Sequence, residues 1–227
     1  KPPTMPLSTP CRPFLSLPYD IRLIIYKFAL IKRTGPPFPE TQIHLHHRKD
    51  PESGTLCPSL LLTCRTIHAE ANEILYSANV FTVVYPRIVL KWLERIGPEN
   101  VKLVKKARVL VEVQTGPREI WYQGWYELFR VLACSASGLR DLEVYWAAVG
   151  VGKRWMSHLA GADVEFVREL GEIKGLSRMR ISGYFAMHWP QYLERKMGLE
   201  VWRADECSEE TLEELRKYQR GTEEVWP

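Results

Sequence analysis

The chain has 227 residues, of which 45% are hydrophobic and 26% charged, so its composition is that of a globular protein and excludes intrinsic disorder. The formal net charge is +4, and the basic residues are scattered apart from Lys102, Lys105, Lys106 and Arg108, which argues against nucleic acid as the main ligand. No apolar run approaches the roughly eighteen residues that a transmembrane helix needs, so no membrane partner is expected.

The predicted elements divide the chain into three parts. Residues 1–13 hold five prolines and are predicted to form a flexible tail. Residues 14–84 are predicted to form a helical module with a long loop at 31–58 that carries a short strand at 42–46. The module's other predicted elements are a helix at 14–30 that Pro18 opens, a helix at 59–78 and a strand at 80–84.

The third part, residues 85–227, alternates strands with helices. A helix at 87–97 is predicted to end at Gly97 and Pro98. The strands that follow are centred near Leu110, Val144 and Met179, about 34–35 residues apart. The predicted strands are 107–113, 139–146, 176–184 and 199–202, and the predicted helices are 119–136, 162–173, 189–198 and 208–220.

Such β–α units stack into a parallel sheet with helices on one side, as in leucine-rich solenoids. The consensus asparagine ladder of those repeats is missing, so an ordinary α/β sheet stays open as the alternative. The predicted fold class is therefore mixed α/β, with a small helical N-terminal part packed on a short, mostly parallel β–α sheet.

The first helix carries two apolar faces. One holds Leu17, Ile21, Ile24, Ile25 and Phe28, and the opposite one holds Tyr19, Leu23, Tyr26 and Leu30. A surface helix needs one apolar face, so this helix must bury both. Either it lies in the centre of its own protein, or one face contacts a partner.

The second helix places His68, Glu70 and Glu73 within six residues, which raises the possibility of a metal or acid–base site. At about 100° per residue, His68 lies roughly 160° from Glu70 and roughly 140° from Glu73 around the helix axis. Metal ligands on one helix need i, i+3 or i+4 spacing, which this cluster lacks. No phosphate-binding loop or nucleophile motif appears either, and "HLHH" at 44–47 is predicted to be a solvated loop. We therefore expect no catalytic residue, no metal site and no cofactor.

Two segments, "LSLPYDIRLIIYKFAL" and "LLLTCRTIHAEANEILYSANVF", carry a family resemblance over about 65 residues. Together they resemble the F-box-like module found in many fungal proteins. The residues that match its pattern are Leu17, Pro18, Asp20, Ile21, Arg22, Ile25, Tyr26, Cys64, Arg65, Glu70, Ala71, Leu75, Tyr76, Asn79 and Phe81.

The resemblance implies a small helical module that docks on a Skp-type adaptor of a cullin ubiquitin ligase, while a following domain, often of leucine-rich repeats, holds the substrate. The residues that it implies for contact with the adaptor are Leu17, Pro18, Ile21, Ile25 and Cys64.

Aromatic residues gather near the predicted strand ends in the second half. Ligands of parallel β–α units bind at the carboxyl ends of the strands, and aromatic residues are enriched in protein interfaces. We therefore expect Tyr145, Trp146, Tyr184 and Phe185 to bind a client protein.

The number and spacing of the cysteines indicate the cellular compartment of the protein. The five cysteines are far apart and odd in number, and no Asn-x-Ser/Thr site or signal-peptide pattern is seen. This pattern favours a reducing compartment, either the cytoplasm or the nucleus.

The function that these observations favour is a non-enzymatic protein–protein interaction module, which by resemblance serves as a substrate-recognition adaptor of a cullin-type ligase. The alternative is a structural subunit or nucleic-acid-associated factor of a larger assembly. In that alternative the F-box-like part serves only as a structural cap, and the basic residues near 102–108, with Lys153, contact phosphates.

Overall fold

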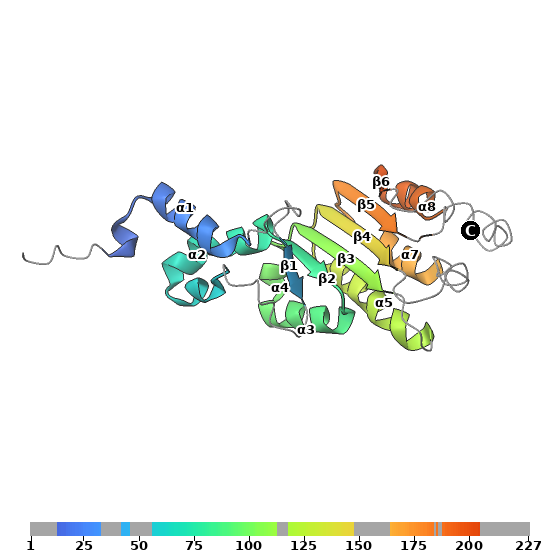
Figure 1. Ribbon diagram of the computed structural model, residues 1–227, viewed down its shortest axis with the longest axis horizontal. Helices are drawn as coiled ribbons and strands as arrows, with labels where there is room; N and C mark the ends of the chain where they lie inside the picture. The colour runs from blue at the N-terminus through green and yellow to red at the C-terminus, as the bar shows by residue number, and fades with distance from the viewer. Residues whose placement is uncertain are drawn as a thin grey trace, which may run out of the picture.

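The structure is a computed structural model that describes residues 13–32, 42–45, 56–112, 118–147, 164–183, 185 and 188–204. Figure 1 shows a helical end built from the N-terminal residues and a sheet with its helices at the other end. The predicted tail up to residue 12, most of the loop 31–58, the three histidine side chains of "HLHH", Lys153, Tyr184 and the helix predicted at 208–220 lie outside the described residues.

The helical end consists of two α-helices, each preceded by a short 3-10 helix. In chain order these are η1 (Phe14–Ser16), α1 (Tyr19–Leu30), η2 (Pro58–Leu62) and α2 (Arg65–Ala78). Both long helices predicted here are therefore interrupted. The first interruption has a clear cause. Leu17 and Pro18 have extended backbone angles, because a proline disfavours helical angles at the residue that precedes it. The second lies at Cys64, whose φ of −161° and ψ of 164° end η2 and make it the N-cap of α2.

Six parallel strands form one sheet in the order of the sequence, β1-β2-β3-β4-β5-β6. They are β1 (Gln42–Leu45), β2 (Val80–Val83), β3 (Lys106–Glu112), β4 (Asp141–Ala147), β5 (Arg178–Gly183) and β6 (Val201–Ala204). Two of these strands come from the segment predicted as the N-terminal module, so the sheet begins inside residues 14–84 rather than after them.

Helices connect the strands from β2 onward, namely α3 (Pro86–Ile96), α4 (Pro98–Val101), α5 (Arg118–Ser135), α7 (Val164–Gly171) and α8 (His188–Met197). Because parallel crossovers are right-handed and the strands follow sequence order, the crossover helices share one face of the sheet. Figure 1 shows α3, α5 and α7 along that side. The prediction of a mixed α/β fold with a parallel sheet is confirmed.

Helix α4 is absent from the prediction. Gly97, at φ 80°, ends α3 as expected. The sequence predicts Pro98 as part of the end of that helix, but Pro98 begins a new helix. It takes the first helical position, where the missing N–H of proline would have no helical partner anyway.

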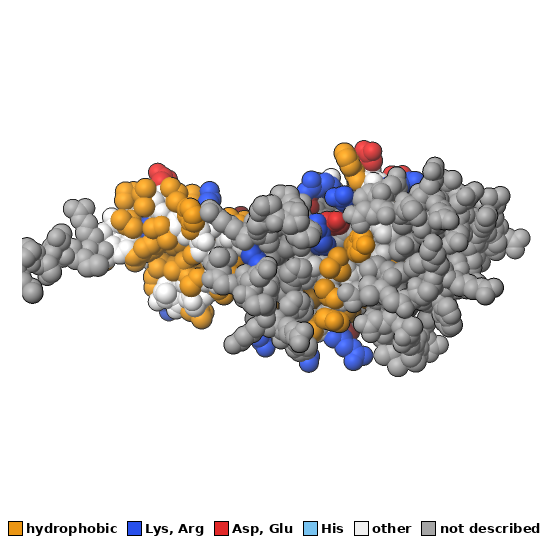
Figure 2. Space-filling view, viewed as in Figure 1, with side chains coloured by type: hydrophobic (Ala, Val, Ile, Leu, Met, Phe, Trp, Pro, Cys, Tyr) orange, Lys and Arg blue, Asp and Glu red, His pale blue; other side chains and the backbone are white. Residues whose placement is uncertain are grey.

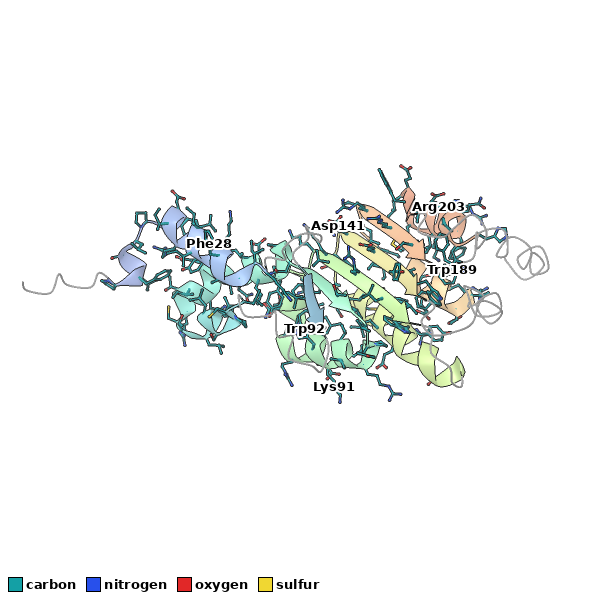
Figure 3. All side chains as sticks on the ribbon, in the orientation of Figure 1. Phe28, Lys91, Trp92, Asp141, Trp189 and Arg203 are labelled. Atoms are coloured by element: carbon teal, nitrogen blue, oxygen red, sulfur yellow. The ribbon has the colours of Figure 1, made fainter. Side chains whose placement is uncertain are left out.

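The core lies between the sheet and its helices. Alternate residues of the central strands point into it, and all are buried: Ala107, Val109, Val111, Leu142, Val144, Trp146, Met179 and Ile181. At its centre the Trp146 ring lies 4.6 Å from that of Phe166 and 5.1 Å from that of Trp189, centroid to centroid, both edge to face. Figure 3 marks Trp189 at this position.

Candidate functional site

The outer face of α1 is apolar and exposed. It holds Ile21, Ile24, Ile25 and Phe28, and the exposed fractions of Ile24 and Phe28 reach 50% and 56%. Three further exposed apolar residues of the helical end are Leu15, Tyr19 and Leu62. Figure 2 shows hydrophobic side chains gathered over α1 and α2, at the end of the molecule farthest from the sheet. We call Ile21, Ile24, Ile25 and Phe28 the α1 apolar face.

The α1 apolar face is free of charge. At about 100° per residue its four side chains fall within an arc of about 100° around the helix axis. The charged residues of the helix, Asp20, Arg22 and Lys27, lie outside this arc. Hydrophobic groups gathered in this way, without polar groups between them, are typical of a surface that contacts another macromolecule.

A polar cluster holds the inner face of α1 to Glu70 of α2. The Arg22 guanidinium donates two hydrogen bonds to the Glu70 carboxylate, from Nε at 2.9 Å and from Nη2 at 2.5 Å. The Tyr26 hydroxyl donates a third to Glu70 at 2.7 Å, and its side chain is fully buried. Charge-assisted bonds of this bidentate kind fix geometry as well as adding stability.

These bonds shift the pKa of each member of the cluster. The hydrogen bonds from Arg22 and then Tyr26 hold the pKa of Glu70 below its ordinary value. The hydrogen bond to Glu70 raises the pKa of Arg22, while burial, followed by that carboxylate, raises the pKa of Tyr26. The Glu70 carboxylate is thus an ionised anchor for α1, and the cluster has no free base that could take up a proton near neutral pH.

A second buried side chain, Asn79, joins the ends of the two helices. Its Nδ2 donates to the carbonyl oxygens of Leu30 at 2.8 Å and Leu75 at 2.7 Å, and its Oδ1 accepts from the Lys32 backbone N–H at 2.9 Å. Asn79 is 0% exposed. It therefore satisfies backbone groups at the carboxyl ends of both α1 and α2, which helices otherwise leave unpaired. Together with Glu70 it fixes α1 with its apolar face outward.

The structure gives different surroundings to the five residues that the resemblance implies for adaptor contact. Ile21 and Ile25 lie on the α1 apolar face, and Pro18 is exposed at its N-terminal end. Leu17 is half-buried. Cys64 is exposed at the N-cap of α2, outside the buried face of that helix.

Further exposed apolar residues lie beside these five. Ile24 and Phe28 belong to the apolar stripe that helical periodicity alone assigns to this face. Leu62 is 86% exposed, but no pattern in the sequence predicts this, because it depends on the 3-10 geometry of η2.

The residues predicted to bind a client at the strand ends do not form one accessible group. Trp146 is 1% exposed within the aromatic core, so its prediction as an accessible residue is wrong. Phe185 is partly buried against that core, and Tyr145 is half-buried on the opposite face of the sheet. Tyr184 lies outside the described residues.

Two observations concern metal and membrane binding. Among the described residues, no group of three or more His, Cys, Asp and Glu side chains is placed to hold a metal ion. In agreement with the helical geometry, Glu70 faces Arg22 while His68 and Glu73 are exposed. Within the same described part of the chain, none of the helices has the length and apolar character that crossing a membrane requires.

A family comparison covers most of the chain. The model of a domain of unknown function, DUF7730, matches residues 34–183, which are 150 of the 227 residues. The chain belongs to the DUF7730 family. No curated protein and no solved structure matches the chain. The DUF7730 match includes Glu70 and Asn79 and the strands from β1 to β5, whereas α1 lies before it.

Proposed function

We propose that this DUF7730 protein is a non-enzymatic protein–protein interaction module that docks through the α1 apolar face. The observation that carries the proposal is the combination of an exposed, charge-free helical face with an inner face locked by Glu70 and Asn79. An amphipathic helix presented in this way is a recurrent mode of recognition between proteins.

The partner that we propose is a Skp-type adaptor of a cullin ubiquitin ligase, in the cytoplasm or nucleus. Its support is the F-box-like pattern, two residues of which, Ile21 and Ile25, lie on the α1 apolar face. The sheet domain then presents the substrate.

The size of the α1 apolar face limits the free energy that docking can gain. Complete burial of a large apolar side chain contributes about 1.5–3 kcal/mol, so covering four side chains that are about half exposed contributes roughly 3–6 kcal/mol. Association costs at least about 4 kcal/mol in lost translational and rotational freedom. The α1 apolar face alone therefore supports weak binding, and stable docking requires contacts with further exposed residues of the helical end, such as Leu15 and Leu62.

The test measures binding of the purified chain to a purified Skp-type adaptor by isothermal titration calorimetry. We expect Ile24→Asp with Phe28→Asp to weaken binding at least about tenfold, because two charges would be desolvated in the interface. Since both side chains are exposed, the melting temperature should change little.

A matched control is Tyr85→Asp. Tyr85 is also an exposed apolar residue, but it caps α3, where aspartate is a favoured N-cap, so this variant should fold and bind the adaptor like the wild type. Absence of any complex with the wild-type chain would refute the adaptor as partner. Equal affinity of the wild type and the double variant would refute docking through the α1 apolar face.

The nucleic-acid alternative has less support from the described basic residues. Of the four clustered ones, Lys102 pairs with Glu99 at 2.7 Å and Arg108 pairs with Glu143 at 2.6 Å. A lysine or arginine that is neutralised by a carboxylate contributes less to phosphate binding. Only Lys105 and Lys106 of that cluster have no ion pair within the described residues.

A further inference from the structure

The face of the sheet opposite the helices carries a charged and aromatic surface outside the site described above. Strand residues alternate between the two faces of a sheet. The residues that lie next to the buried core residues along each strand therefore point to this open face. They are Lys106 and Arg108 on β3, Asp141 and Glu143 on β4, Arg178 and Arg180 on β5, and Trp202 on β6. Figure 3 marks Asp141 near the beginning of β4.

The strand register arranges these residues in two rows across the sheet. The first row runs Lys106, Asp141, Arg178, and the second runs Arg108, Glu143, Arg180, Trp202. Each row contains one ion pair: Arg178 with Asp141 at 3.1 Å and Arg108 with Glu143 at 2.6 Å. A third row, towards the carboxyl ends, holds Tyr145, which is half-buried, and Ser182, which is buried, so the accessible surface lies in the first two rows.

One edge of this surface is basic, aromatic and exposed. Arg180 is exposed and, within the described part of the chain, makes no ion pair or hydrogen bond, because Glu143 in its row is bonded to Arg108. Beside it Trp202 is 63% exposed, which is unusual for a tryptophan on an ordered strand. Arg178 has only an exposed pair with Asp141, of the kind that contributes little stability and is easily exchanged. We call Arg178, Arg180 and Trp202 the β5–β6 patch.

The spacing of the β5–β6 patch indicates the chemistry that it recognises. Arg178 and Arg180 are two residues apart on one strand, so their Cα atoms lie about 6.6 Å apart. Carboxylates at alternate positions of an extended peptide have the same spacing, because the repeat of an extended chain is the same. Trp202, on the neighbouring strand about 4.8 Å away, offers an apolar surface against which a side chain of such a peptide can pack.

We propose that the β5–β6 patch binds an extended, acidic segment of a protein, with carboxylates at alternate positions facing Arg178 and Arg180. The inference rests on the proposed interaction function, since it gives the client's binding surface and chemistry. Arginine binds carboxylates through two parallel hydrogen bonds, and arginine and tryptophan are enriched where interfaces gain most of their affinity.

The arrangement favours a peptide over nucleic acid. The two rows contain four basic and two acidic side chains, a net charge of +2, and the acidic ones lie between the basic ones. Asp141 and Glu143 would repel a continuous phosphate backbone. An extended peptide that carries charge only on alternate residues meets the basic column of β5 and leaves the acidic column of β4 uncontacted.

The test uses the intact chain and three labelled peptides of eight residues, in which threonine alternates with glutamate, glutamine or lysine, with fluorescence anisotropy as the readout. We expect the glutamate peptide to bind at least about tenfold more tightly than the other two, with affinity that falls as salt is added. Arg178→Glu with Arg180→Glu should remove at least about tenfold of that affinity, and Trp202→Ala should weaken it about threefold or more.

The control is Lys91→Glu with Arg95→Glu, which makes the same change in charge at exposed positions of α3, on the other face of the sheet. This control variant should keep wild-type affinity. If both charge-reversal variants lose the same affinity for the glutamate peptide, the effect is one of net charge and the proposal is overturned. Equal affinity of the wild type for the glutamate and glutamine peptides would also overturn it. An eight-nucleotide single strand that binds more tightly than the glutamate peptide would assign the patch to phosphate instead.

The two proposals fail separately in this experiment, because no adaptor is present. The variant with Ile24→Asp and Phe28→Asp should bind the glutamate peptide like the wild type, whatever its effect on the adaptor. Loss of peptide binding in that variant would contradict the assignment of the client surface to the sheet.

Discussion

Replacing Asn79 by alanine removes the side chain that joins the carboxyl ends of α1 and α2. In the native chain its amide satisfies the Leu30 and Leu75 carbonyl oxygens and the Lys32 backbone N–H, at distances from 2.7 to 2.9 Å. Asn79 itself is fully buried, so water is not already present to replace it. The substitution therefore leaves three backbone groups without a partner.

The expected loss of stability follows from the number of unpaired groups. Each buried polar group left without a hydrogen bond costs about 1–3 kcal/mol, and some of these groups will regain a partner as the site relaxes. We expect the free energy of unfolding to fall by about 3–4 kcal/mol. For a chain of this size each kcal/mol lowers the melting temperature by about 2–4 °C, so Asn79→Ala should lower it by roughly 6–16 °C.

Urea and thermal unfolding followed by circular dichroism measure this loss, with Asn72→Ala as the matched control. Asn72 is an asparagine within α2, but it is only half-buried and donates one hydrogen bond, to Asn100 at 2.5 Å. Its removal should cost about 1 kcal/mol. If the two variants differ by less than about 1 kcal/mol, the reasoning that assigns Asn79 the role of joining the helices is refuted.

Three further substitutions test other parts of the structure. Because hydrogen bonds from Arg22 and Tyr26 lower the pKa of Glu70, its stabilising contribution is complete above the ordinary value of 4.5 and disappears as the pH falls through its lower folded-state pKa. In urea unfolding, Glu70→Gln should therefore have a lower free energy of unfolding than the wild type near pH 7, and nearly the same free energy near pH 2. An equal difference between the two proteins at both pH values would contradict this reasoning. Trp146→Ala should cost about 3–5 kcal/mol as a core truncation, and the exposed Trp202→Ala less than about 0.5 kcal/mol. Similar losses from the two substitutions would contradict the assignment of Trp146 to the core.

The sheet could be predicted from the sequence because its strands carry a strong local signal. Runs such as 107–113 and 139–146 are rich in β-branched and aromatic residues, and each predicted strand overlaps the observed one. Their regular spacing with helices between them then requires a parallel sheet with right-handed crossovers. The C-terminal strand β6 was also predicted, although its bounds moved from 199–202 to Val201–Ala204.

The prediction that Tyr145 and Trp146 lie together on an accessible surface is wrong, because it ignored the alternation of side chains along a strand. Tyr145 and Trp146 are consecutive residues of β4, so they must point to opposite faces and cannot share one surface. The register places Trp146 with the buried Val111, on the helix side. Alternation along β4 would have revealed this from the sequence, whereas the β5–β6 patch could not be found that way, because it depends on the pairing of β5 with β6.

The break at Cys64 could not be predicted for a different reason. The residues of 59–78 form a continuous apolar stripe, and no proline or glycine interrupts it after Pro58. The helix breaks because Cys64 adopts an extended conformation between η2 and α2, and this conformation is set by how η2 packs beside both helices rather than by the local sequence. The same break leaves Leu62 exposed at the end of η2.

The family segment and α1 depend on each other. The DUF7730 match begins at residue 34, after α1, yet Glu70 and Asn79 inside the match bond to α1 and to the residues that follow it. Without α1, Glu70 would lose the guanidinium that balances its charge, and the apolar face of α2 that covers Tyr26 and Leu30 would be exposed to water. The DUF7730 fold in this protein is therefore complete only with the helix that precedes the matched residues. Because Ile21, Ile24, Ile25 and Phe28 are exposed on the outer face of α1, substitutions there should change stability little, whereas the inner face makes the contacts with α2.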